Sequence, residues 1–348
     1  MAIPSPEQQV EFLRKVQRLL SEGLFVASYK FALLRALADL AVLKGEDSDA
    51  ELALHVNDIA GAVIELYWRQ SRPFYPAGGQ QAILKQNTGK QAAIIQTLAS
   101  VQAEYRGSLP QLRHDLARWN GLVGKVADVI CVMPLWKLQR IGDDVVDFLY
   151  PNVGKARTIT LRPGVTYCLR NFYGLLRNLI EGAWLGYVRN LNLDVLGQTI
   201  DFAAFLFGTE RTTLDGYRPI LLDVQRGSCF YCRRPLTGAG DVDHFVPWSR
   251  YPVDLGHNFV VAHKTCNARK VDYLAAEEHL GAWAERNRLH GEALGRAFAD
   301  ASLPYDVSSS VSITRWAYRQ TATAGGLVWV QDKTLKHLDP GWERLLAG

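Results

Sequence analysis

The chain has 348 residues, a length that accommodates two or three domains with hydrophobic cores. Hydrophobic residues make up 48% of it and charged residues 21%, proportions that exclude an intrinsically disordered chain and are typical of an ordinary soluble protein. The formal net charge of +4 permits nucleic-acid binding without requiring it.

The amino terminus shows no signal for secretion or for membrane insertion. Its first residues lack the apolar core of a signal peptide. The most apolar early run, residues 24–43, is interrupted by charged side chains and is too polar for a membrane span. The five cysteines give no indication of a disulfide framework. We therefore expect a cytoplasmic protein without membrane contact, in which Cys131 and Cys168 are buried thiols.

Residues 1–127 have the pattern of a helical domain. Pro4-Ser5-Pro6-Glu7 is typical of a helix start. A second helix is expected over residues 24–43 and a third over residues 52–67, with two more after them. The domain has no visible active site, so target sensing, partner binding and dimerisation all remain open as its role.

Residues 128–212 are expected to form a mixed α/β region that packs on the helical domain. Stretches rich in β-branched and aromatic residues predict short strands over residues 129–138, 145–150 and 158–161. A long helix is then expected over residues 169–188, and another helical region over residues 201–207.

The remaining chain divides into a metal-binding domain at residues 213–275 and a helical C-terminal extension at residues 276–348. Helices are expected over 214–225, 274–286, 289–301 and 313–318, and a strand over 327–330. The sequence as a whole therefore predicts an α+β protein that is mostly α.

Two pairs of metal-ligand residues stand in the third domain: Cys229-x-x-Cys232 and His263-x-x-Cys266. Three thiolates and one imidazole at these spacings suit a closed tetrahedral zinc site. Such a site stabilises a small segment that buries little apolar surface of its own. The pattern therefore predicts a structural Zn²⁺.

Residues with different ligand chemistry lie between and beside these pairs. Asp243 and Asn267 carry hard oxygen atoms, which suit Mg²⁺ or Mn²⁺ rather than zinc. His244 follows Asp243 directly and is placed to act as a general base beside that cation. We therefore expect one structural zinc and a separate catalytic divalent cation.

The order of these residues over 229–270 resembles the HNH endonucleases, whose active site is the ββα-metal fold. The resemblance implies that Asp243 and His244 lie on the first strand, that Asn258 begins the second, and that Cys266 and Asn267 lie at the start of the helix. In the family, residues at these positions have defined roles. By resemblance, Asp243 and Asn267 hold the cation, His244 activates the attacking water, and Asn258 orients that histidine.

Two positions depart from the commonest family pattern. Asn267 stands where histidine is frequent, a variation that the family also shows. His263 stands where a cysteine is usual, and a Cys₃His set is ordinary zinc chemistry.

Four basic residues near the predicted centre are expected to contact the nucleic-acid backbone: Arg250, Lys264, Arg269 and Lys270. A solvated charged face is the alternative interpretation. For His257 three roles are open: phosphate binding, packing, or merely flanking the motif.

The sequence thus predicts metal-dependent hydrolysis of DNA phosphodiester bonds. One such site cuts one strand, so a double-strand break needs two protomers or two visits, and a homodimer or a partner protein is compatible with that. The resemblance to stand-alone bacterial nucleases suggests phage defence or restriction. Two alternatives are a zinc-stabilised nucleic-acid-binding module without catalysis and a nuclease subunit that is inactive without its partner.

Overall fold

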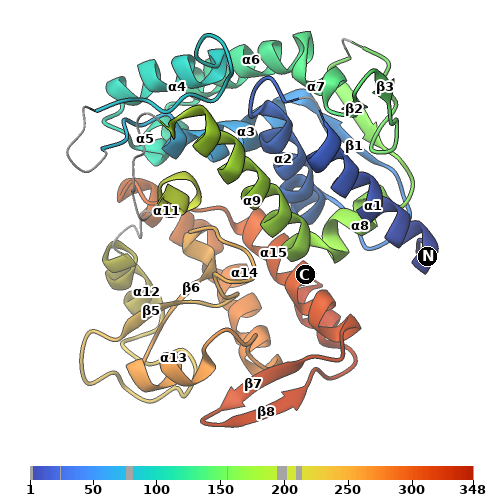
Figure 1. The fold of residues 1–348 in the computed structure, drawn as a ribbon. Helices are drawn as coiled ribbons and strands as arrows, with labels where there is room; N and C mark the ends of the chain where they lie inside the picture. Colours follow the sequence, from blue (N-terminus) through green and yellow to red (C-terminus); the bar gives the residue numbers. More distant parts are fainter. Residues whose placement is uncertain are drawn as a thin grey trace. The chain divides into compact units, whose positions relative to one another are not determined.

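The computed structural model describes residues 3–23, 25–75, 81–154, 156–193, 202–208 and 214–347. The chain forms two compact units, Met1–Gly208 and Thr209–Gly348 (Figure 1). In both units most of the regular secondary structure is helical, and the strands pair into two-stranded antiparallel sheets. The prediction of an α+β, mostly helical protein is therefore confirmed.

The elements of the N-terminal unit are, in chain order, α1 (Pro6–Glu22), α2 (Tyr29–Lys44), β1 (Leu52–His55), α3 (Val56–Gln70), α4 (Ala93–Glu104), α5 (Leu109–His114), α6 (Leu116–Val132), α7 (Pro134–Lys137), β2 (Arg140–Ile141), β3 (Asp144–Val145), β4 (Thr158–Leu161), α8 (Val165–Asn171), α9 (Tyr173–Leu191) and α11 (Phe202–Phe207). Strand β1 pairs with β4, and β2 pairs with β3.

The predicted start of α1 is confirmed by its cap. Ser5 Oγ accepts a hydrogen bond from the Gln8 backbone N–H, and the Gln8 side chain accepts one from the Ser5 N–H. This reciprocal pair satisfies two of the backbone donors that a helix start leaves open. Pro6 occupies the first helical turn, where its missing N–H costs nothing.

Helix α2 packs against α3, α8 and α9 (Figure 1). A buried guanidinium secures its C-terminal end: Arg170 Nη1 donates to the carbonyl oxygens of Ala41, Val42 and Gly45. The charge of Arg170 is balanced by Asp47, whose carboxylate accepts from Arg170 Nε at 2.7 Å. These bonds satisfy the carbonyls at the end of the helix and so fix where α2 stops.

Several predicted boundaries in this unit are wrong. The strand expected over 129–138 is instead the end of α6 followed by α7, because the apolar residues there bury one helical face. Residues 52–55 form β1, so the third helix begins only at Val56. Helix α2 begins at Tyr29; residue 24, the predicted start, lies outside the described residues.

The other expectations in this unit are met in full or in part. Of the strand predicted over 145–150, only Val145 belongs to a strand, β3. The predicted strand over 158–161 is present as β4. The long helix over 169–188 is divided between α8 and α9, and residue 201, the expected start of α11, lies outside the described residues.

The elements of the C-terminal unit are η1 (Leu214–Gly216), α12 (Arg218–Val224), β5 (Asp241–His244), η2 (Gly256–Asn258), β6 (Phe259–Ala262), α13 (Lys264–Lys270), α14 (Glu277–Asp300), α15 (Val307–Thr323), β7 (Leu327–Gln331), β8 (Thr334–His337) and η3 (Trp342–Leu346). The two helices predicted over 274–286 and 289–301 form one continuous helix, α14 (Glu277–Asp300), because no proline interrupts it and its buried face continues through Gly291 and Gly295. The C-terminal extension also contains the β7–β8 hairpin.

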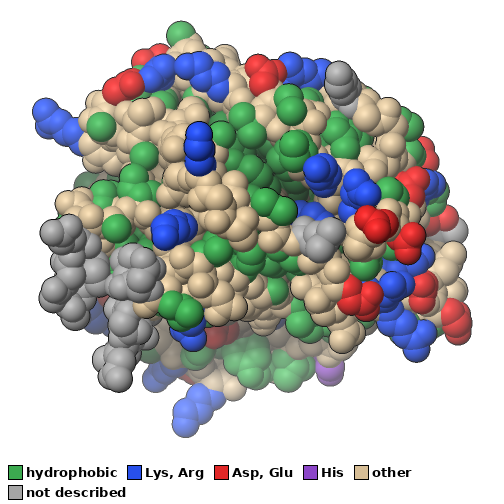
Figure 2. Space-filling view, turned by 45° about the horizontal axis from the view of Figure 1, so that its top comes forward, with side chains coloured by type: hydrophobic (Ala, Val, Ile, Leu, Met, Phe, Trp, Pro, Cys, Tyr) green, Lys and Arg blue, Asp and Glu red, His purple; other side chains and the backbone are tan. Residues whose placement is uncertain are grey.

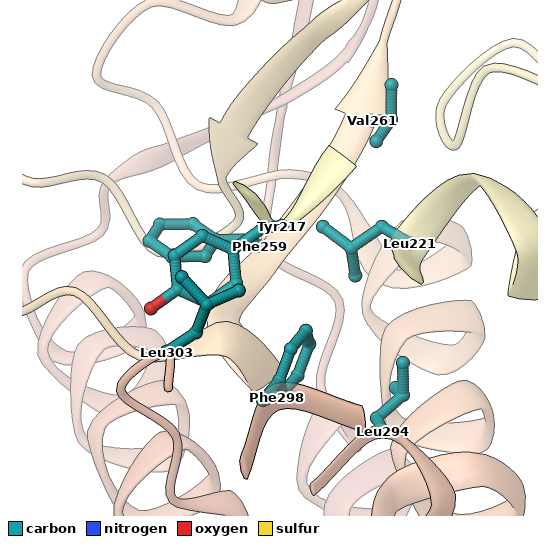
Figure 3. Packing of buried hydrophobic residues seen from close by; sticks show 7 residues of the cluster. All are labelled: Tyr217, Leu221, Phe259, Val261, Leu294, Phe298 and Leu303. Atoms are coloured by element: carbon teal, nitrogen blue, oxygen red, sulfur yellow. The ribbon is translucent and has the colours of Figure 1, made fainter. Parts of the chain in front are cut away.

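An apolar cluster joins α12, β6 and α14 (Figure 3). Its buried members are Tyr217, Leu221, Phe259, Val261, Leu294, Phe298 and Leu303. Burial of each large apolar side chain contributes about 1.5–3 kcal/mol. The cluster therefore holds β6, and with it the paired strand β5, firmly against α14.

None of the described helices is both long enough and apolar enough to cross a membrane. On the face drawn in Figure 2, basic and acidic side chains are interspersed among the others, so charges of both signs share that surface.

Candidate functional site

The segment that carries the predicted metal ligands folds as two strands and a helix. Strand β5 runs antiparallel to β6, with His244 opposite Phe259, and α13 follows β6. All four residues of β6 are buried, as expected for a run of Phe, Val, Val and Ala. The Gln225 side chain and the Phe230 backbone N–H form hydrogen bonds with the backbone of Val261. These bonds satisfy the backbone groups on the edge of β6 that does not pair with β5.

The first cysteine pair lies in a tight turn beside this sheet. Cys229 N–H donates to the Arg234 carbonyl at 2.9 Å, and Arg233 N–H donates to the Cys229 carbonyl at 3.0 Å. Arg233 adopts a left-handed backbone with φ 62°, which reverses the chain after Cys232. The turn therefore brings the two thiols of the pair to the same side.

The two metal-ligand pairs, Cys229-x-x-Cys232 and His263-x-x-Cys266, meet in one cluster. One ligand atom from each of Cys229, Cys232, His263 and Cys266 lies within 4.8 Å of every other. Four ligands of one zinc ion are about 3–4 Å apart at metal–ligand distances near 2.0–2.3 Å. The donor set and its spacing are therefore compatible with zinc. Across the described ranges, no second group of His, Cys, Asp and Glu side chains forms a comparable cluster.

The ring of His263 is oriented for metal binding through Nδ1. Its Nε2 lies 3.1 Å from the Pro235 carbonyl, which can only accept a hydrogen bond, so Nε2 carries the proton. Nδ1 then presents its lone pair and lies 3.3 Å from Cys232 Sγ. A ligand histidine held by a carbonyl at its other nitrogen is typical of structural metal sites.

Proton affinities in the cluster differ between its thiols. Burial by itself would raise the pKa of Cys232, but hydrogen bonds from Arg234 and Cys229 outweigh it and lower that pKa. Burial and the nearby sulfurs of Cys229 and Cys232 raise the pKa of Cys266. Three adjacent thiols can therefore be ionised together only if a cation balances their negative charges, and Zn²⁺ is such a cation.

Asp243 lies in a buried polar cluster on the α13 side of β5. Its Oδ2 accepts a hydrogen bond from Tyr231 Oη at 2.5 Å and lies 3.1 Å from Lys270 Nζ. Burial and the Asp243 carboxylate raise the pKa of Tyr231 well above its usual value, so this hydroxyl remains a donor. Lys270 also donates to the His244 carbonyl at 2.9 Å. The ammonium therefore fixes the strand end that carries Asp243.

Asn267 lies one turn before Lys270 on α13 and has a different partner. Its Nδ2 is 3.4 Å from Oδ2 of Asp241, which shares a face of β5 with Asp243. Among the described residues, Oδ1 of Asp243 and Oδ1 of Asn267 have no hydrogen-bond partner. These hard oxygens suit a divalent cation, and Asp241 is an additional carboxylate that the sequence analysis did not single out.

His244 projects to the other face of β5, since successive side chains of a strand alternate. Its Nε2 lies 2.8 Å from Oδ1 of Asp254, which comes from the loop between β5 and η2. Asp254 is not among the residues predicted from the sequence. It has no motif spacing to His244, and only the path of the loop places it there.

Asn258, predicted to orient His244, makes no hydrogen bond to the ring of that histidine. Its Oδ1 accepts from the Val246 N–H at 2.9 Å, and its Nδ2 donates to the Val246 carbonyl at 3.0 Å. Asn258 therefore holds the backbone that follows His244. His257 is buried and its Nε2 bonds to the Gly291 carbonyl, which answers the open question in favour of packing.

The basic residues predicted to contact a nucleic acid occupy different environments. Lys264 and Arg269 are exposed. Arg250 is half-buried and donates to Thr321 Oγ1 at 3.0 Å. Lys270 is fully buried, so its prediction as a phosphate contact is corrected: its ammonium neutralises Asp243 instead. The other predicted thiols, Cys131 and Cys168, are buried, as expected.

Comparisons with protein-family models, with curated proteins and with solved structures gave no match for this chain. The function is therefore inferred from the arrangement of the side chains.

Replacing Lys270 with methionine is expected to lower the free energy of unfolding of the C-terminal unit by about 3–5 kcal/mol, because Asp243 would keep a buried charge without its partner. Denaturant unfolding measures the change. The matched control is Lys264→Met at an exposed position of the same helix, expected to stay within about 0.5 kcal/mol of wild type. Equal stability of the two variants would contradict a structural role for the Lys270 ammonium.

Proposed function

We propose that this protein is a metal-dependent endonuclease that hydrolyses DNA phosphodiester bonds at an HNH-like site in its C-terminal unit. The observation that carries the proposal is the Cys₃His cluster beside a strand, strand and helix, in which β5 ends in Asp243 and His244 and α13 carries Asn267. A zinc module that only stabilises a fold has no need of these polar residues at its centre.

The proposed reaction is an in-line attack of water on phosphorus. His244 accepts a proton from the attacking water as general base. The bond from phosphorus to the 3′ oxygen breaks, and that oxygen takes a proton from solvent, which leaves 5′-phosphate and 3′-hydroxyl ends. Mg²⁺ or Mn²⁺ held by Asp243 and Asn267 would stabilise the charge that develops on the phosphate and the leaving oxygen.

The remaining residues have supporting roles in this proposal. Exposed Lys264 and Arg269 on α13 are suited to hold the phosphate backbone near the site. The N-terminal unit is proposed to sense the target or to bind a second copy or a partner protein. Phage defence or restriction in the cytoplasm is the setting in which such a nuclease would act.

One observation favours a second candidate function. Lys270 already neutralises Asp243, so the carboxylate has less electrostatic attraction for a cation than an unpaired one. A zinc-stabilised module that binds nucleic acid without cutting it would accommodate this pair. In this alternative, the cluster around Asp243 only stabilises the fold.

Incubation of the pure full-length protein with supercoiled plasmid and a series of divalent cations tests the proposal. Nicked or linear product that requires Mg²⁺ or Mn²⁺, and that chelation abolishes, is the expected result. Retention of the plasmid without loss of phosphodiester bonds would support the binding module. If the plasmid is neither retained nor cut, the remaining reading is a nuclease subunit that needs a partner, and the stand-alone enzyme proposed here would be wrong.

A further inference from the structure

A carboxylate outside the predicted motif contacts the proposed general base. Asp254 Oδ1 lies 2.8 Å from His244 Nε2, and the two side chains are only 13% and 16% exposed. An oxygen of this kind accepts a hydrogen bond, so the proton of a neutral His244 ring lies on Nε2. Its Nδ1 then carries the lone pair.

The ring of His244 is held in place by aromatic neighbours. Phe259 packs against it edge to face, with ring centroids 4.7 Å apart, and Trp248 lies at 5.5 Å in a similar geometry. Nδ1 has no hydrogen-bond partner among the described residues and is not among their fully buried unpaired atoms. The nitrogen with the lone pair is therefore the one left to meet a water molecule.

Asp254 itself sits in a loop that is anchored on both sides. Tyr251 before it and Leu255 after it are buried. The Gly256 N–H donates to the Pro304 carbonyl at 3.0 Å, and a Cβ at Gly256 would meet the Phe298 ring at 2.5 Å, so the chain approaches α14 closely. These contacts hold the Asp254 backbone in one position, so its carboxylate meets His244 without a large loss of entropy.

We propose that Asp254 is a positioning residue for His244. Its carboxylate fixes the Nε2–H tautomer and the orientation of the ring, so that Nδ1 faces the attacking water. The catalytic part of this inference rests on the proposed nuclease function. The structural part, the tautomer, does not.

The tautomer is tested without DNA. Full-length protein labelled with ¹⁵N at histidine is studied by long-range ¹H–¹⁵N NMR at alkaline pH, where the rings are neutral, and His244→Ala identifies the signal. The wild type is expected to show one tautomer with the proton on Nε2, and Asp254→Ala is expected to lose that preference. A proton on Nδ1 in the wild type, or an unchanged pattern in Asp254→Ala, would overturn the inference.

The catalytic role is tested by cleavage kinetics. Asp254→Ala is expected to lower kcat by about 10- to 100-fold, part of the contribution of a general base, while KM and zinc content stay at wild-type values. If the alanine variant does not fold, Asp254→Leu is the second variant, because it keeps a side chain of similar size and removes the oxygen that accepts from Nε2. The matched control is Asp223→Ala, an exposed carboxylate on α12, expected to cleave like wild type.

The outcomes separate the two proposals. A wild type that cuts in Mg²⁺ or Mn²⁺ together with an Asp254→Ala variant of equal kcat would overturn the positioning role and leave the nuclease function standing. An inert wild type would overturn the nuclease function and the catalytic part of this inference, while the NMR result still decides the tautomer.

Discussion

Replacing His244 with alanine is expected to reduce the rate of DNA cleavage by about 10²–10⁴-fold, the usual contribution of a positioned general base. The reason is that Nδ1 is the ring nitrogen left for the water once Nε2 is paired with Asp254. Zinc content and DNA retention should stay close to wild type, since the zinc ligands and the basic surface are unchanged. Steady-state nicking of supercoiled plasmid measures the loss.

The matched control is His290→Ala, which removes an exposed imidazole from α14. Because the His244 ring also packs on Phe259, His244→Gln provides a variant that keeps more of the side-chain volume. Both His244 variants should be slow and folded. A His244→Ala protein that cuts at the wild-type rate would remove this residue from the mechanism.

Cys229→Ser or Cys266→Ser is expected to abolish stoichiometric zinc binding and to unfold the metal-binding part of the C-terminal unit. Structural zinc contributes about 10–16 kcal/mol of apparent binding free energy in small zinc modules, and each ligand of a closed site is needed for most of it. Metal analysis of purified protein and circular dichroism measure the two losses. Cys131→Ser is the matched control, because its thiol lies outside the cluster.

Asp243→Ala separates the two metal sites. It should retain zinc, since its carboxylate lies apart from the Cys₃His cluster, and should lose cleavage. The variant also leaves the Lys270 ammonium unpaired, so Asp243→Asn is the gentler second substitution. Loss of zinc from the Asp243 variants with retention in the cysteine variants would invert the assignment of the two sites.

Local patterns determined part of this fold from the sequence. The cap of α1 follows from Ser5, Pro6 and Gln8, because its bonds join residues only three apart. The family resemblance implied two strands and a helix around the metal-ligand pairs, and β5, β6 and α13 lie there, although Asn258, expected to begin the second strand, lies in η2 directly before it. The strand predicted over 129–138 was wrong, because β-branched residues on a buried helical face have the composition of a strand.

The sequence by itself determined which residues can bind zinc. Ligand type and spacing specify the Cys₃His set, and the fold brings its atoms within 4.8 Å. Tertiary structure alone decided the partners of the other polar residues. Asp254 reaches His244 through a loop, and Lys270 turns inward to Asp243. The physical reason is that a charged residue in a sequence fits a solvated surface and a buried pair equally well. The packing of α13 and of the loop against the sheet selects between these environments.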